Sequence, residues 1–152
     1  MARRALVDGF ELDDDPARID VDAVHRFISD ESYWGVGRPR ELVERAIRNS
    51  ARVMGLYRGT EQVGFARAVS DRTIIAYLAD VYVLAEFRGR GLGLELVREM
   101  IDGGPFEGLT WVLHTASQQK LYEKVGFKSQ FVYPLMERRR RKVDGEAPYR
   151  SP

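Results

Sequence analysis

Cysteine is missing from all 152 residues of the sequence. Without a thiol, the chain can form no disulfide framework, no cysteine-ligated zinc site and no cysteine nucleophile. Histidine is nearly as scarce, and His25 and His114 lie far apart in the sequence. A histidine-based metal site would need carboxylate ligands as well, and no metal is expected. A chain of this length can bury one sizeable core without such cross-links.

The sequence also lacks a strong excess of charge and a long apolar run. A formal net charge of +1 does not indicate a general nucleic-acid-binding protein. No stretch approaches the roughly 20 apolar residues that span a bilayer. The basic first residues are followed by acidic ones rather than by the apolar core of a secretory signal. We therefore expect a cytoplasmic protein with no membrane partner.

The hydrophobic pattern changes its period along the chain and predicts a mixed set of elements. Strands are predicted at residues 5–12, 51–57, 62–69, 73–84, 109–114 and 127–133, and helices around 22–28, 40–47, 92–101 and 117–125. This order predicts an α/β fold with one domain, residues 1–137, in which helices flank a mixed, mostly antiparallel sheet. Residues 138–152 are charged and contain proline, and we expect this basic tail to be disordered.

The most informative segment follows the longest apolar run. A buried strand is predicted to end near Leu84, and a short turn then leads into a helix. The residues that open this helix are Arg88, Gly89, Arg90, Gly91, Leu92 and Gly93. The N-terminus of a helix has unpaired N–H groups and a partial positive charge, and glycine lets an anion approach the backbone closely. The segment therefore predicts a phosphate-binding cradle, although a plain turn with a helix cap would have the same local pattern.

Two familiar nucleotide-binding patterns do not fit this segment. The dinucleotide-binding fingerprint has the spacing G-x-G-x-x-G, whereas the glycines here alternate. The P-loop requires a lysine followed by serine or threonine, and neither dipeptide occurs here.

The segment resembles the acyl-CoA motif of the GNAT superfamily of N-acetyltransferases. That motif reads [RQ]-x-x-G-x-[GA]. Arg88, Gly91 and Gly93 match its three defined positions. Residues 121–127 resemble a second family segment, LYEKxGF, at the expected distance. Residues 115–119 depart from the polar pair followed by alanine that close relatives often carry before the tyrosine.

The resemblance implies a GNAT-like fold that binds acetyl-CoA as a cosubstrate. In such enzymes two strands separate, and the pantetheine arm lies against the exposed strand backbone, here at Val81, Tyr82 and Val83. The pyrophosphate would lie on the amides of residues 88–93. The implied reaction is direct transfer of an acetyl group, in a ternary complex, to a primary amine of a small molecule.

Three groups are candidates for the chemistry of this transfer. A backbone N–H near Val83 would stabilise the oxyanion. Tyr122 resembles the residue that protonates the leaving thiolate in the family, although it could also be a packing aromatic. Asp80 could take the proton of the amine through water. It could equally pair with an arginine, because an unpaired buried carboxylate is costly.

The loop between the first two helices is the candidate for binding the acceptor. Tyr33, Trp34 and Arg38 would border the acceptor pocket in this fold, or would form a lid that packs on the core. His114 ends a predicted strand near the cleft, so it is better placed to act than His25.

Other functions stay open at this stage. A larger acyl group could replace acetyl, and a non-catalytic domain of the same fold could sense acyl-CoA or bind a protein. The run of basic residues at 138–142 could contact RNA, although short basic tails are usually only solvated. A homodimer is possible but has no residue pattern to support it.

Overall fold

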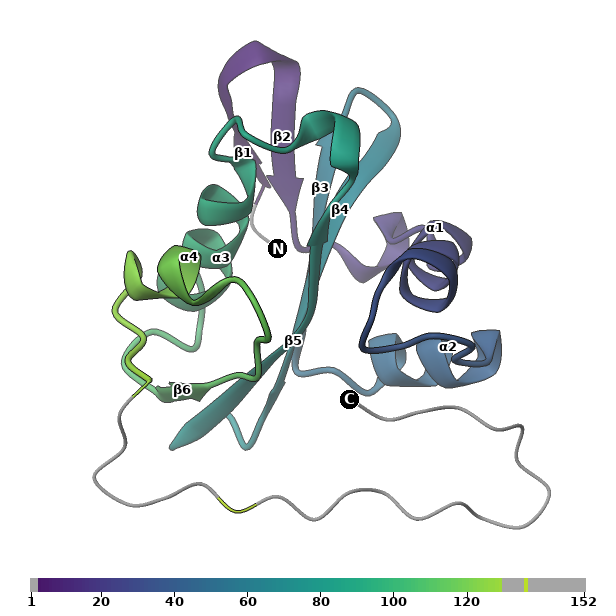
Figure 1. The fold of residues 1–152 in the computed structure, drawn as a ribbon. Helices are drawn as coiled ribbons and strands as arrows, with labels where there is room; N and C mark the ends of the chain where they lie inside the picture. Colours follow the sequence, from purple (N-terminus) through teal and green to yellow (C-terminus); the bar gives the residue numbers. More distant parts are fainter. Residues whose placement is uncertain (1–2, 130–135, 137–152) are drawn as a thin grey trace, which may run out of the picture.

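The computed structural model describes residues 3–129 and 136, which form a mixed six-stranded sheet flanked by helices (Figure 1). The strands lie in sequence order in the sheet, β1 (Arg3–Ala5), β2 (Phe10–Asp13), β3 (Arg52–Arg58), β4 (Glu61–Ser70), β5 (Ile75–Val83) and β6 (Thr110–Val112). Every neighbouring pair is antiparallel except β5 and β6, which run parallel. The predicted fold class is confirmed.

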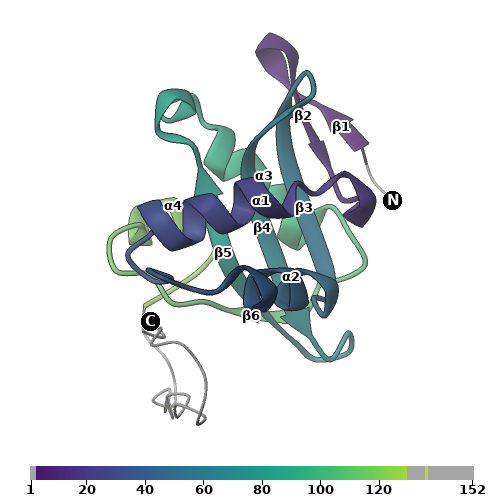
Figure 2. The same cartoon turned by 90° about the vertical axis from the view of Figure 1, so that its right-hand side faces the viewer.

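Helices cover both faces of the sheet (Figures 1 and 2). They are α1 (Val21–Arg26), which continues into a π-helical turn (Phe27–Glu31), α2 (Arg40–Arg48), α3 (Leu92–Asp102) and α4 (Gln119–Glu123). The apolar stripes of α1 and α2 form one core with Phe65 and Tyr82 of the sheet. Leu96, Val97 and Met100 of α3 form the other core with β3 and β4. The sheet therefore buries an apolar face on each side, and the fold has three layers, with helices, sheet and helices in turn.

The N-terminal segment differs from the prediction of a single strand over residues 5–12. It folds as a hairpin, in which β1 pairs with β2 and Arg4 lies opposite Leu12. The turn contains Asp8 and Gly9, both with positive φ (58° and 76°). Asp-Gly is a common hairpin turn because both residues tolerate this conformation.

The predicted C-terminal elements are only partly described. Residues 127–129 form no strand. The rest of the predicted strand 127–133 and the tail 138–152 lie outside the described residues.

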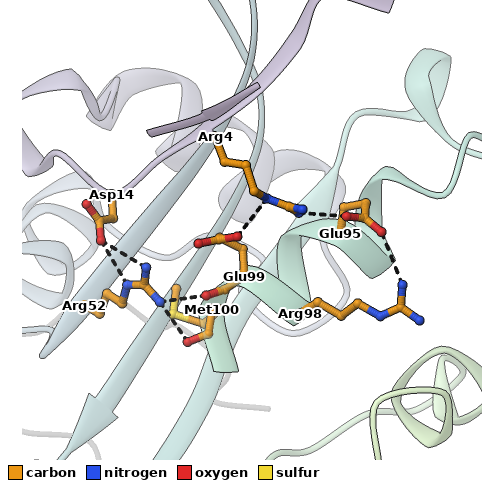
Figure 3. Close-up of polar contacts among 7 residues, drawn as sticks. All are labelled: Arg4, Asp14, Arg52, Glu95, Arg98, Glu99 and Met100. Carbon is orange, nitrogen blue, oxygen red and sulfur yellow. Dashed lines mark hydrogen bonds and ion pairs between the residues drawn. The ribbon is translucent and has the colours of Figure 1, made fainter. Parts of the chain in front are cut away.

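A buried arginine fixes the C-terminal end of α3 to the sheet (Figure 3). Arg52 of β3 is 6% exposed, and its Nη1 donates to the carbonyl oxygens of Glu99 (2.7 Å) and Met100 (3.0 Å). Its Nε and Nη2 donate to the Asp14 carboxylate. Arg4 of β1 forms ion pairs with Glu95 and Glu99 of the same helix. The last carbonyls of a helix lack partners within it, so Arg52 acts as a C-terminal cap.

We expect Arg52→Met to lower the free energy of unfolding by about 2 kcal/mol, because the buried Met100 carbonyl and Asp14 lose a charged hydrogen-bond donor. The Glu99 carbonyl keeps the hydrogen bond from the Gly103 N–H. Urea unfolding followed by circular dichroism measures this change. Arg98→Met is the matched control, since Arg98 is a residue of α3 whose ion pair with Glu95 lies at the exposed surface. Equal stability of the two variants would contradict the capping role.

Candidate functional site

The edge of β5 is open along its second half. β5 and β6 pair only as far as Tyr77 and Val112, and beyond this point no described strand pairs with β5 on that side. Leu84 N–H donates to Val63 O in β4, so Leu84 faces β4. Because successive residues of a strand point their backbone groups to opposite sides, Val83 and Val81 face the open edge. The backbone of Tyr82 faces β4, and only its two neighbours present amide groups to a ligand.

A bulge in β5 changes which side chains face the α1 and α2 layer. Phe65 lies opposite Tyr82 and Arg67 opposite Ala79, so β5 has one extra residue between these pairs. Asp80 lies in this bulge with a φ of 51°. The extra residue reverses the alternation, because a strand otherwise alternates its faces strictly. Asp80 and Tyr82 consequently both lie on the side of α1 and α2.

The Asp80 carboxylate is the centre of a buried polar network. Arg67 Nε donates to Oδ2 at 2.6 Å, and Arg38 Nη1 lies 3.1 and 3.0 Å from the two oxygens. Trp34 Nε1 donates to Oδ1 at 3.1 Å. Burial alone would raise the pKa of Asp80, but the two guanidinium groups outweigh it and hold the pKa below its ordinary value. The structure thus contains the predicted arginine pairing, and this makes Asp80 a weak proton acceptor.

The predicted cradle opens α3 as a turn with free amides. Gly89 and Gly91 both have a φ of 77°, which favours glycine. The five amides of residues 89–93 donate no hydrogen bond within the described part of the chain. The Leu92 side chain is buried in the core, so only its amide can contribute. Arg88 directs its Nε to Val83 O (2.8 Å), whereas Arg90 lies exposed beside the amides.

Tyr122 lies on α4 and packs toward α3. Its ring packs on the α3 core and lies edge-on to Phe127, with ring centroids 5.9 Å apart. Burial, with smaller contributions from Tyr33 and Tyr77, raises the pKa of Tyr122 to about 12. The phenol therefore keeps its proton at neutral pH, as a general acid must.

The loop between α1 and α2 crosses to the segment after β6. Tyr33 is 61% exposed, and its hydroxyl accepts a hydrogen bond from Ala116 N at 3.0 Å. Its ring lies edge-on to Trp34. Of the three residues predicted to border the pocket for the acceptor substrate, Tyr33 is thus at the surface. Arg38 is buried and supports the loop through its ion pair with Asp80.

Two residues of the site were not singled out from the sequence. Arg67 completes the Asp80 network. The Tyr77 hydroxyl lies 2.8 Å from Nδ1 of His114. An arginine within a predicted strand was the available signal for Arg67. His25, by contrast, contacts the Arg38 carbonyl through Nε2.

Neither a metal-binding cluster nor a membrane-spanning helix occurs among the described residues. Within 3–129 and 136, no three histidine, aspartate or glutamate side chains come together so as to hold a metal ion. Among the same residues, no helix has the length and apolar character to cross a membrane.

An open strand edge, followed by a helix that begins with free amides, is the arrangement that the resemblance to the GNAT superfamily implies. The chain belongs to the acetyltransferase (GNAT) family, whose model matches residues 21–127. The family resemblance drawn from the two motifs is confirmed.

Individual relatives agree with this assignment. A Gibberella zeae protein provisionally named an acetyltransferase is 32% identical over 136 residues, which cover 75% of this chain and 76% of the relative. A solved GNAT-family structure from Xanthomonas campestris pv. campestris superposes with a TM-score of 0.81 at 35% identity, over 86% of this chain and 92% of that one. A Deinococcus radiodurans structure at 20% identity (TM-score 0.63, 89% and 93% covered) supports the fold alone.

Proposed function

We propose that the protein transfers an acetyl group from acetyl-CoA to a primary amine of a small molecule, by direct attack in a ternary complex. The observation that carries this proposal is the row of five free amides at residues 89–93, next to the open edge of β5. The amides suit a pyrophosphate, and the backbone of Val81 suits an amide group of a pantetheine arm. The Val83 carbonyl already accepts a hydrogen bond from Arg88 Nε, which leaves the Val83 N–H for a ligand. Arg90 adds positive charge at the cradle.

The roles of the remaining residues follow from their positions. The Val83 N–H faces the open edge, where it can stabilise the oxyanion that forms during attack. Tyr122 supplies the proton to the departing thiolate. The sequence-based role of Asp80 as a base stays a prediction, and its three hydrogen-bond donors favour a different role, that of positioning Trp34 and the acceptor loop.

A thiol-release assay with acetyl-CoA and a panel of primary amines tests the proposed activity. We expect coenzyme A to appear with at least one amine. Calorimetry should show that acetyl-CoA binds. Binding without thiol release would identify a non-catalytic acyl-CoA sensor, and no binding at millimolar ligand would refute the cradle.

Gly91→Ala should weaken acetyl-CoA binding about tenfold, the equivalent of about 1.4 kcal/mol. The φ of 77° at Gly91 is strained for alanine, so relief of the strain would turn the amides of the cradle away from the phosphates. Gly59→Ala is a matched control, because Gly59 has a φ of 62° and equally open space but lies in the β3–β4 turn. Calorimetric titration should show weaker binding for Gly91→Ala only.

A further inference from the structure

We propose that Tyr77 and His114 form the path that takes the proton from the acceptor amine, on the face of the sheet opposite to Tyr122. This inference rests on the proposed transferase function and adds the group that completes its proton balance. It is carried by the position of the pair at the point where β5 and β6 separate.

The Tyr77–His114 pair spans the two separating strands. Tyr77 and Val112 are the last residues that pair between β5 and β6, and His114 follows Val112 by two residues. The Tyr77 hydroxyl lies 2.8 Å from His114 Nδ1, with the two rings 5.6 Å apart. A hydrogen-bonded phenol and imidazole therefore lie at the start of the open edge, one from each strand.

The pair and Tyr122 approach this edge from opposite faces. Trp111 and Leu113 pack with Tyr122 in the α3 core. Since side chains alternate along a strand, His114 points to the other face, where Tyr33 and the loop between α1 and α2 lie. Tyr33 and Tyr77 both contribute electrostatically to the raised pKa of Tyr122. A thioester along β5 would have its proton donor on the α4 side and a proton acceptor on the side of α1 and α2.

The other candidate bases in the described region are less suitable. Asp80 already accepts hydrogen bonds from two arginines and Trp34, and these stabilise its anion. His25 contacts the Arg38 carbonyl through Nε2. His114 is exposed, so its imidazole can exchange protons with water.

The proton transfer balances when His114 is in the neutral tautomer with a proton on Nε2. Tyr77 then donates its hydroxyl to Nδ1, and the phenol oxygen accepts, through water, a proton from the ammonium form of the amine, which frees the nitrogen lone pair for attack. The Tyr77 proton moves to Nδ1 and the Nε2 proton leaves to water, and exchange with water later restores the Nε2 tautomer. As the C–N bond forms and the C–S bond breaks, the nitrogen releases its second proton to water. The sulfur takes the Tyr122 proton, which water replaces. The products are an amide and the free thiol of coenzyme A.

Two nucleophiles distinguish a proton acceptor from a structural pair. The best alkylamine of the panel is mostly protonated at neutral pH and needs a base, whereas hydroxylamine is mostly neutral. We expect His114→Gln and Tyr77→Phe to lower kcat with the alkylamine about a hundredfold. The rate with hydroxylamine should fall far less. An equal fall with both nucleophiles, or no fall with the alkylamine, would overturn the proposal.

Tyr57→Phe serves as the control for Tyr77→Phe. Tyr57 is a buried tyrosine of β3 whose hydroxyl donates to the Arg18 carbonyl, and it lies outside the site. Its substitution should leave kcat unchanged with both nucleophiles. Wild-type protein that releases no thiol with any amine would refute the proposed function itself, which separates that failure from failure of the Tyr77–His114 path.

A second measurement does not depend on the acceptor or on the folding of variants. Nitrogen-15 NMR of the full-length wild-type protein with acetyl-CoA reports the tautomer of His114. We expect the neutral imidazole to carry its proton on Nε2 and to accept a hydrogen bond at Nδ1. A neutral imidazole protonated at Nδ1 would donate to Tyr77 instead, and this result would overturn the proposed path.

Discussion

Replacement of Tyr122 by phenylalanine is expected to lower kcat for acetyl transfer about a thousandfold, while the Kd for acetyl-CoA stays the same. Phenylalanine keeps the packing on the α3 core and the edge-on contact with Phe127. Only the phenolic proton is lost, so the leaving thiolate has no donor. Steady-state kinetics and calorimetry on the same variant separate turnover from binding.

The raised pKa of Tyr122 fixes the expected pH dependence. Below about 12 the phenol is protonated, so the acid should not be lost on the alkaline side until the pH nears that value. Tyr57→Phe is again a suitable control, because burial also raises the pKa of Tyr57 to about 12 and the residue lies away from the site. Unchanged turnover in Tyr122→Phe would remove this residue from the mechanism.

Asp80→Ala should lower the free energy of unfolding by about 3–5 kcal/mol, because it leaves the guanidinium groups of Arg38 and Arg67 buried without their anion. Urea unfolding at neutral pH measures the loss. Asp22→Ala is the control, since Asp22 pairs with Arg40 at the exposed surface, where ion pairs contribute little. Similar stability of Asp80→Ala and Asp22→Ala would show that the network is dispensable.

The lowered pKa of Asp80 also predicts a direction with pH. A carboxyl group whose pKa is lower in the folded state stabilises the protein above the pKa of the unfolded state, and this stabilisation is lost as the pH falls through the folded value. For Asp80 the loss should therefore occur in acid, at and below the ordinary value of 3.8. The Asp80→Ala variant should lack this part of the acid unfolding.

Local patterns were sufficient to predict the elements that form the cradle. The apolar run at 73–84 became β5 (Ile75–Val83), and the stripe at 92–101 became α3 (Leu92–Asp102). Both signals depend on neighbours in the sequence, such as the spacing of apolar residues and the glycines at the helix start. The N-terminal hairpin could have been predicted in the same way from Asp8-Gly9. The alternation of apolar and polar residues alone suggested one strand.

The side chains that gather around the open edge could not be predicted in this way. Strict alternation would place Asp80 and Tyr77 on opposite faces, and only the bulge brings Asp80 to the side of α1 and α2. The Tyr77–His114 contact depends on the register between β5 and β6, which lie far apart in the sequence. Register and bulges are properties of the assembled sheet.

The cap that Arg52 provides has a consequence for how the protein is handled. The same helix has the cradle at its first turn and is held at its last turn by Arg52, Asp14 and Arg4, two of which belong to the first 14 residues. The beginning of the chain therefore braces, through α3, the distant loop that we propose as the acetyl-CoA cradle. Trimming or fusing that end would disturb the alignment of the cradle without touching it.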